Sequence, residues 1–295
     1  LDPTTGWSQL TINNGEALNR GVELQLNGII LRPVNRNSLG IRALLNFTYN
    51  KNEVTKVNHQ PTSGSEALLY YTLHEGYPIH SLFAYRFAGM VNEDNIQYFS
   101  WVGADGQIHT SDITVDDIVY CGELDPKYMA GFTPEISYAG FTLSAMISYY
   151  GGHYMRARVE DWSSDGNQYG YYQPGEVDAF PSAYLNYWRN EDKTLYPANG
   201  YLGGQNIVGD YRYMDTSVVP ADYIKLRNIV LGYEFPRKLC QQIGVNTLRM
   251  RIQANNLATW TRNNLGVDPE ANNPTTGINL LSTPRSYTMS LSINF

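Results

Sequence analysis

The sequence contains no long apolar run and few basic residues. No stretch of eighteen apolar residues occurs among its 295 residues, which excludes a transmembrane helix. The 21 Lys and Arg residues are outnumbered by 28 Asp and Glu and form no cluster, which argues against nucleic acid as a partner. The net charge of −7 and the mean hydropathy of −0.37 fit a soluble acidic protein. They do not exclude a membrane-spanning β-barrel, because half of its wall residues face a polar lumen.

Cysteine is scarce, and the motifs of catalysis are missing. Cys121 and Cys240 lie far apart and outside any metal-ligand spacing, so we expect two unpaired thiols. The five His residues occupy unrelated segments without an HxxxH spacing. The glycine-rich stretch at residues 200–204 follows no strand-to-helix transition, which argues against a phosphate-binding loop. We therefore expect no enzymatic activity and assign no catalytic residue.

What the sequence does contain is alternation with a period of two. In residues 286–295 (SYTMSLSINF) apolar and polar side chains alternate, and the segment ends on Phe295. A soluble edge strand would usually end in a charge or a turn. A strand of about ten residues, rising ~3.3 Å per residue and tilted by ~45°, spans roughly 24 Å, the height of the apolar band of an outer-membrane barrel. The segment therefore predicts a strand with one face in lipid.

Other segments repeat the pattern and predict an all-β protein of about eight antiparallel strands. They are residues 21–31, 39–51, 141–150 and 247–255, completed by residues 81–90 and 128–138, with residues 7–13 as a candidate ninth. Residues 223–235 shift phase, because Lys225 and Arg227 share a parity with the apolar residues that follow them. The shift indicates either a bulge or a strand whose first residues lie above the membrane. Residues 236–243 predict one short helical turn.

The predicted connections are sharply unequal. Residues 139–140 form a minimal turn and residues 33–38 a short one, whereas residues 156–220 and 261–284 are long. Outer-membrane barrels have short periplasmic turns and long outer loops. If the C-terminus is periplasmic, counting the strands back from it places both long loops on the outer side of the membrane. The direction of the strands within residues 1–127 stays open.

The chain resembles the C-terminal third of a SusC/RagA-type TonB-dependent outer-membrane transporter of Bacteroidetes. The matching stretches, in order, are NRGVELQL (19–26), NFTYNKNEVTKV (46–57), EGYPIHSLFAYRFAG (75–89), LDPKYMAGFTPEISYAGFT (124–142), ADYIKLRNIVLGYEFP (221–236), LRMRIQANNLATWT (248–261) and PRSYTMSLSINF (284–295). Each stretch is a weak signal alone, but their order and spacing cover nearly the whole chain.

The resemblance implies that residues 1–295 are the C-terminal portion, about 8–9 antiparallel strands, of a 22-stranded transmembrane β-barrel with long extracellular loops. The plug domain and the N-terminal strands are then absent from this chain, and a start without Met fits a processed form or a fragment. The implied function is active import of oligosaccharides or peptides across the Gram-negative outer membrane. The implied partners are membrane lipids, a SusD-like surface lipoprotein and TonB–ExbB–ExbD, which would act through the missing N-terminal part. Phe295 would end the signal for barrel assembly.

Aromatic residues crowd the loop at residues 156–220 and are our candidates for substrate or partner contact. They are Trp162, Tyr169, Tyr171, Tyr172, Tyr187 and Trp188. Aromatic faces stack on sugar rings, while nearby Asn and Asp bind hydroxyl groups. The alternative is that these rings pack the loop on itself and against the lipoprotein, since a large loop needs an internal core.

Three further expectations concern charged and interfacial residues. Arg249 and Arg251 face the lumen in this phasing, where they either line the pathway or pair with plug carboxylates. Trp260, at the end of a strand, is a candidate girdle residue.

Many members of this family carry a calcium-like acidic stretch before the segment that corresponds to residues 126–128. In this chain the alternation of acidic residues is broken. The carboxylates that could bind a Ca²⁺ ion in this loop are Asp105, Asp112 and Asp116. We therefore expect a solvated acidic loop and no cofactor or metal, with a loop Ca²⁺ as the alternative.

Two other functions fit parts of the sequence. A soluble β-rich glycan-binding module would explain the Tyr-rich loops but not the apolar strand at the C-terminus. A passive porin would need no plug. The exterior of the fold separates the first alternative from a barrel, because a continuous apolar belt ~25 Å tall belongs to a membrane protein.

Overall fold

The computed structural model describes residues 15–93, 96–111, 114–157, 201–202, 205–206, 213–277 and 280–295. Its elements are β1 (Gly15–Leu31), β2 (Gly40–Val57), α1 (Gly64–Ala67), β3 (Ser81–Tyr85), β4 (Phe87–Glu93), β5 (Ile96–Val102), β6 (Ile108–His109), η2 (Val115–Asp117), β7 (Ile118–Glu123), β8 (Tyr128–Tyr138), β9 (Phe141–Gly151), β10 (Tyr154–Arg156), β11 (Tyr201–Leu202), β12 (Gln205–Asn206), η3 (Asp215–Ser217), β13 (Val218–Pro220), β14 (Tyr223–Glu234), α4 (Arg237–Gln242), β15 (Thr247–Thr261), η4 (Pro269–Ala271) and β16 (Ser286–Asn294). None of the described helices is long and apolar enough to cross a membrane. Both cysteines are free thiols, as predicted.

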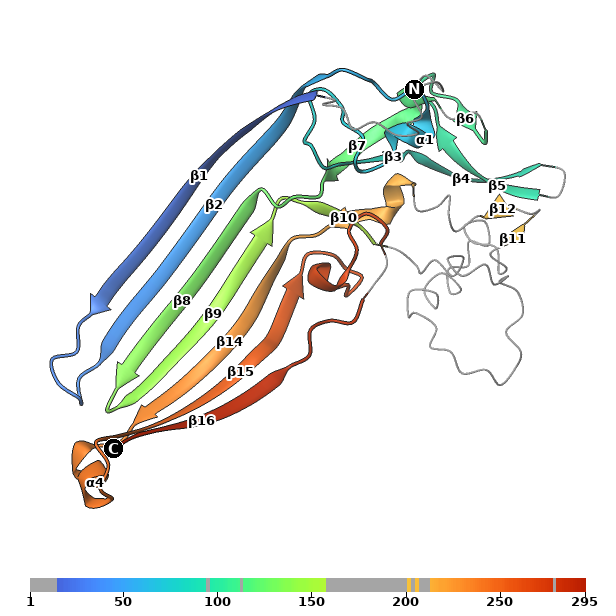
Figure 1. Ribbon diagram of the computed structural model, residues 1–295. Coiled ribbons are helices and arrows are strands. Elements are labelled where there is room, and N and C mark those ends of the chain that lie inside the picture. Colours follow the sequence, from blue (N-terminus) through green and yellow to red (C-terminus); the bar gives the residue numbers. More distant parts are fainter. Residues whose placement is uncertain are drawn as a thin grey trace, which may run out of the picture.

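Seven long strands form one antiparallel sheet in the order β1-β2-β8-β9-β14-β15-β16. They run side by side from β1 at one edge to β16 at the other, and the smaller elements other than α4 gather beyond one end of the sheet (Figure 1). Within the described residues β1 pairs only with β2, and β16 only with β15. The sheet is therefore an arc of a barrel wall that does not close on itself, which confirms the predicted all-β fold class.

One face of the sheet is apolar and uncovered. A single register row crosses all seven strands through Leu31, Ile41, Ile136, Leu143, Leu231, Ile252 and Met289. Leu143, Leu231 and Met289 are 46%, 43% and 67% exposed, so no second layer of the described protein covers this face. A monomeric soluble protein rarely exposes so continuous an apolar surface.

Aromatic side chains mark both ends of the apolar face. At the end near the long connections, Tyr49 and Tyr128 have ring centroids 5.3 Å apart, and Trp260 is 56% exposed. At the other end, Phe141 and Tyr233 have centroids 4.4 Å apart. The stretch of β9 from residue 141 to residue 149 is about 26 Å long at ~3.3 Å per residue. Two aromatic belts at this separation are typical of a membrane-spanning wall.

Short and long connections alternate between the two ends. Ala139 and Gly140 join β8 to β9 with φ angles of 51° and 87°, the left-handed pair that a two-residue hairpin requires. The β1–β2 turn lies at the same end, as does α4, the predicted helical turn. Residues 58–127, 152–222 and 262–285 leave from the opposite end. Because residues 58–127 form one excursion between β2 and β8, the strand direction left open by the sequence is settled.

One strand predicted for the wall lies instead in the long connection between β2 and β8. Residues 81–90 form β3 and the start of β4, which belong to two small sheets, β3-β7 and β4-β5-β6. All five residues of β3 are buried, so this strand is covered on both faces and does not present one face to lipid. The other candidate strand, residues 7–13, lies outside the described residues.

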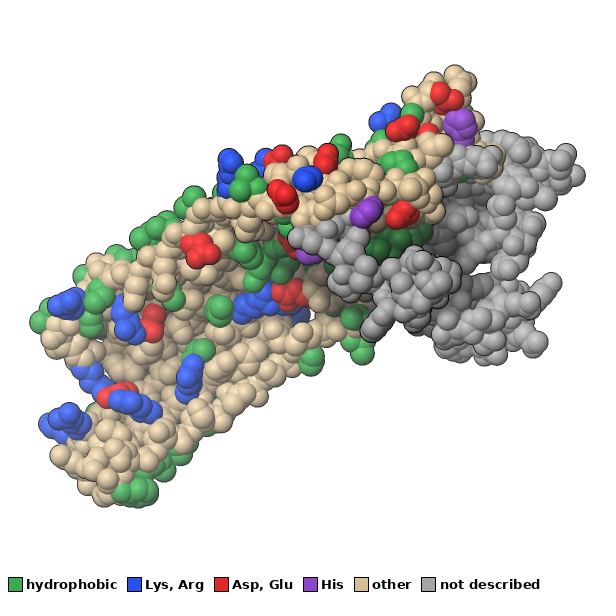
Figure 2. Space-filling view, turned by 45° about the horizontal axis from the view of Figure 1, so that its top comes forward, with side chains coloured by type: hydrophobic (Ala, Val, Ile, Leu, Met, Phe, Trp, Pro, Cys, Tyr) green, Lys and Arg blue, Asp and Glu red, His purple; other side chains and the backbone are tan. Residues whose placement is uncertain are grey.

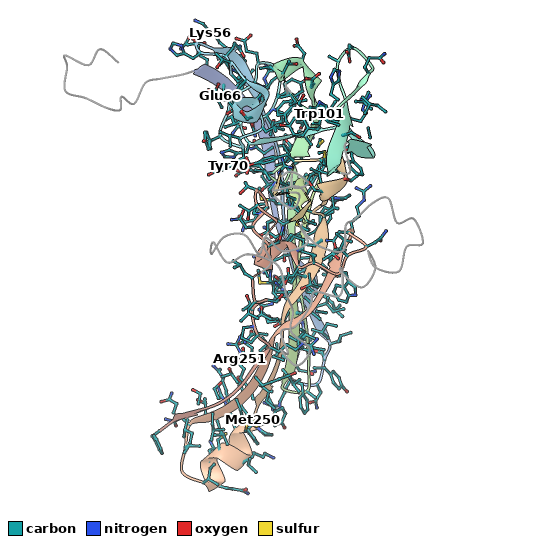
Figure 3. All side chains as sticks on the ribbon, turned by 90° about the vertical axis from the view of Figure 1, so that its right-hand side faces the viewer. Lys56, Glu66, Tyr70, Trp101, Met250 and Arg251 are labelled. Carbon is teal, nitrogen blue, oxygen red and sulfur yellow. The ribbon has the colours of Figure 1, made fainter. Side chains whose placement is uncertain are left out.

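A small apolar core holds the excursions together. It consists of Leu68, Phe83, Tyr85, Trp101 and Met214. The labelled Lys56, Glu66, Tyr70 and Trp101 all lie at this end of the molecule, far from Met250 and Arg251 in the lower part of the wall (Figure 3). Met214 comes from the connection between β9 and β14, so two long connections share this core.

A β-bulge explains the phase shift in β14. Its register slips between Leu226 and Asn228: against β9, Arg227 is an extra residue without a partner, whereas on the β15 side Arg227 faces the two residues Asn256 and Leu257. Opposite it, Asn256 of β15 adopts a φ of 55°. Lys225 pairs with Ser148 on the polar face, whereas Leu226 pairs with Ile147 on the apolar face. The bulge is thus confirmed, and it turns two cations away from the apolar face.

Candidate functional site

The polar face of the sheet is the candidate functional surface. Its side chains alternate with those of the apolar row and include two cross-strand ion pairs, Arg42 with Glu135 and Arg249 with Glu234. Figure 2 shows Lys, Arg, Asp and Glu side chains along the hollowed face of the curved sheet. Such a surface can bind polar cargo through hydrogen bonds and charge.

Both predicted lumen-facing arginines lie on this polar face. Arg249 Nε donates to Glu234 Oε2 at 2.9 Å. Arg251 pairs in register with Gly232 and Ser290 and makes no ion pair with any described residue. Whether this face lines a lumen stays a prediction.

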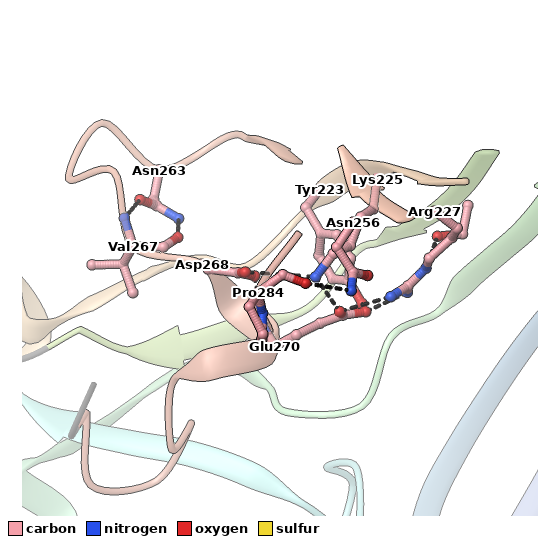
Figure 4. Close-up of polar contacts among 10 residues, drawn as sticks. Tyr223, Lys225, Arg227, Asn256, Asn263, Val267, Asp268, Glu270 and Pro284 are labelled. Atoms are coloured by element: carbon pink, nitrogen blue, oxygen red, sulfur yellow. Dashed lines mark hydrogen bonds and ion pairs between the residues drawn. The ribbon is translucent and has the colours of Figure 1, made fainter. Parts of the chain in front are cut away.

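A four-donor cluster ties the β15–β16 connection to the wall. Glu270 of η4 accepts a hydrogen bond from the Tyr223 hydroxyl at 2.8 Å and another from Lys225 Nζ. Arg227 donates hydrogen bonds to both carboxylate oxygens: Nη1 lies 2.7 Å from Oε2, and Nη2 donates to Oε1. The four donor atoms belong to three residues of β14, which converge on Glu270 (Figure 4). The arrangement is a complete carboxylate-binding site.

Neighbouring groups fix this cluster in place. Arg227 Nε donates to Ser148 Oγ at 2.8 Å, which orients the guanidinium. Asp268 caps η4 through the Glu270 N–H at 3.1 Å and lies 3.6 Å from Lys225 Nζ. Burial acts to raise the pKa of Glu270, but the hydrogen bonds from Arg227, Lys225 and Tyr223 outweigh it and lower this pKa to about 2. The carboxylate is therefore ionised at neutral pH.

A buried arginine joins the three outer excursions. The Arg156 side chain is almost fully buried, and its Nη2 donates to the Phe83 carbonyl at 2.7 Å. Its guanidinium lies 5.3 Å from the centroid of the Tyr213 ring, and Nη1 lies 3.4 Å from Ser217 Oγ. Asn272 Nδ2 donates to the Arg156 carbonyl at 2.8 Å. Arg156 thus contacts residues from each of the three long connections.

A histidine and an aspartate occupy the junction between the wall and the outer part. Asp222 accepts hydrogen bonds from the Gly152 N–H at 2.6 Å and from Arg262 Nη1 at 2.8 Å. His153 is buried, and its Nδ1 has no hydrogen-bond partner among the described residues and lies 4.0 Å from Asp222 Oδ1. Burial lowers the pKa of His153, so the ring is neutral at neutral pH.

The candidate calcium loop uses its carboxylates internally. Asp105 accepts from the Gln107 N–H at 2.9 Å and contacts His109 Nε2 at 2.9 Å. Asp117 accepts from the Ala104 N–H at 2.9 Å. Asp116 is exposed, and Asp112 lies outside the described residues. In the part of the chain that the structure describes, no three metal-ligating side chains converge.

The aromatic contact candidates, Trp162, Tyr169, Tyr171, Tyr172, Tyr187 and Trp188, all lie outside the described residues. The sequence reasoning missed Glu270, Arg156 and His153 as structural contacts. For Glu270 the sequence did hold a signal: Lys225 and Arg227 lie where β14 shifts phase, and charges at the start of an apolar strand need a partner.

Comparison with known proteins gives a consistent picture. No protein-family model matches the chain. Two curated relatives from Formosa agariphila are the TonB-dependent receptors P39, 25% identical over 91% of this chain, and P3, 23% identical over 100% of it. The chain spans 29% and 30% of their lengths. Both relatives are named as receptors, and neither name describes an enzyme.

Solved structures share the fold. The RagAB peptide transporter superposes with a TM-score of 0.67 at 24% identity, covering 100% of this chain and 31% of that one. The RagAB peptide importer in its 'open-open' state gives a TM-score of 0.61 at 19% identity. The relatives and these structures together support a SusC/RagA-type TonB-dependent transporter, of which this chain matches part of the β-barrel.

Proposed function

We propose that residues 1–295 form the C-terminal portion of the barrel of an outer-membrane importer of oligosaccharides or peptides. The row of apolar side chains across seven strands carries the proposal, because a soluble glycan-binding module would have to bury it. The outer edges of β1 and β16, which pair with no other described strand, fit continuation into further strands of a longer protein. The plug and the remaining strands would come from that longer protein.

The partners and the energy source are part of the same proposal. A SusD-like lipoprotein would cover the outer excursions, and TonB–ExbB–ExbD would act through the plug. The TonB-dependent relatives favour this active mechanism over a passive porin. The aromatic residues at 162–188 favour sugar cargo, whereas the structural neighbour described as a peptide transporter favours peptides.

Uptake by intact cells tests the function. A strain lacking the full-length gene should lose uptake of either a labelled oligosaccharide mixture or a labelled peptide mixture, and the complemented strain should regain it. Collapse of the proton-motive force should abolish the regained uptake. Uptake that survives both gene loss and de-energisation would contradict the proposal.

Membrane location tests the barrel separately. The full-length protein should fractionate with the outer membrane and migrate faster on gels when it is not heated. Full solubility in buffer, with migration unchanged by heat, would favour the soluble module.

A further inference from the structure

We propose that Tyr223, Lys225 and Arg227 form a binding site for a substrate carboxylate, which Glu270 occupies in this structure as an internal ligand. The inference rests on the proposed import function and narrows its substrate class. When the β15–β16 connection withdraws Glu270, a carboxylate of the cargo takes the same donors. Peptides with a free C-terminus and glycans with a uronic acid share this chemistry.

The donor geometry suits a carboxylate better than other cargo groups. The planar guanidinium of Arg227 contacts both oxygens of Glu270 side by side, which is the forked arrangement that selects carboxylates. Lys225 adds a second charge on one oxygen, and the Tyr223 hydroxyl adds a neutral donor on the other. A neutral sugar hydroxyl could engage one of these donors but not the whole set.

The site needs an anion at all times. The Lys225 side chain is only 4% exposed, and a buried ammonium without a partner is strongly unfavourable. Asp268, the second acid near Lys225, belongs to the same short segment as Glu270, so both leave together. Departure of this segment therefore favours binding of an external carboxylate.

The second ion pair on the same face offers a matched comparison. In the Arg249–Glu234 pair the side chains are 62% and 49% exposed, against 24% and 26% for Arg227 and Glu270. Exposed pairs are screened by water and leave no desolvated charge when they open. Neutralising Glu234 should therefore have little effect on cargo binding, whereas neutralising Glu270 empties the site.

Binding measurements on the detergent-solubilised full-length protein test the inference. The probes are a pentapeptide with a free C-terminus, its C-terminal amide, a tetragalacturonate and a neutral tetrasaccharide. In Glu270→Gln, whichever acidic probe the protein uses should bind about tenfold more tightly than in the parent, because the internal competitor is gone. Comparing the free peptide with its amide tests for a peptide carboxylate, and comparing tetragalacturonate with the neutral tetrasaccharide tests for a uronic acid carboxylate.

Three further variants control the measurement. Glu234→Gln should leave all four affinities unchanged, and adding Arg227→Lys to Glu270→Gln should remove most of the gain. Glu270→Asp keeps the charge on a shorter side chain and should give an intermediate gain. Unheated gel mobility confirms that each variant is folded.

Equal binding of the acidic and neutral probes by Glu270→Gln overturns the inference and leaves Glu270 as a structural clamp. In that case outer-membrane location and energised uptake would still support the proposed function. Loss of those two properties in the parent protein would instead remove the proposed function itself.

Discussion

At the scale of single residues, Arg156 links the three long connections of the outer part. Its buried side chain contacts Phe83 of one connection and Ser217 and Tyr213 of another, while Asn272 of the third donates to its main-chain carbonyl. We expect Arg156→Met to loosen the connections, since a hydrogen bond from a charged group to a buried carbonyl contributes about 1.5–3 kcal/mol. Limited proteolysis of the full-length protein should show faster cleavage outside the wall. Arg156→Lys should be cleaved at an intermediate rate, and equal rates for all three proteins would refute the role.

His153 makes the junction sensitive to acid. Burial lowers its pKa below the ordinary 6.5, while Asp222 and Asp125 act in the opposite direction. Because the folded-state pKa is lowered, the neutral ring stabilises the junction above pH ~6.5, and this stabilisation is lost as pH falls through the lowered value. Protease resistance of the outer part should therefore decrease from about pH 7 to 5. His153→Gln should flatten that dependence; an unaltered pH profile in the variant would assign it to other groups.

At the scale of elements, adjacent residues of β16 provide a direct test of the two faces. Met289 belongs to the apolar row, whereas Thr288 pairs with Gln253 on the polar face. Met289→Arg should destabilise the folded barrel by about 2–4 kcal/mol, the cost of a cation at the membrane midplane. Thr288→Arg should cost far less. Urea titration of the full-length protein in lipid vesicles measures both, and similar losses would show that the apolar face does not meet lipid.

The same scale shows how far the sequence predicts the fold. Alternation located five of the seven strands of the wall, residues 128–138 were added as a further strand, and the parity of Lys225 and Arg227 in residues 223–235 indicated the bulge. Residues 81–90 were wrongly assigned to the wall, because they show no alternation that would distinguish a strand with one face in lipid from a strand buried on both faces. Glu270 could not be predicted, because it lies 43 residues from Arg227 in a segment without periodicity. Such contacts depend on how a long connection folds back, which local patterns do not encode.

At the scale of the whole molecule, the unequal connections predict a topology across the membrane. Gln107 lies at the exposed tip between β5 and β6, and Asn37 lies in the exposed β1–β2 turn at the opposite end. In intact cells, a membrane-impermeant maleimide should label Gln107→Cys of the full-length protein. Asn37→Cys should react only after permeabilisation. The parent protein measures the background from its own thiols, and the reverse pattern would invert the proposed orientation.

All three long connections leave from one rim, while shorter connections at the other rim and the strand pairing hold the register of the wall. Doubling the length of a flexible closed segment costs only about 0.6 kcal/mol of chain entropy. Insertions and deletions at that rim thus disturb neither the turn at Ala139 and Gly140 nor the alternation of the strands. Related chains can therefore diverge in their long connections while the seven-stranded sheet keeps the same fold.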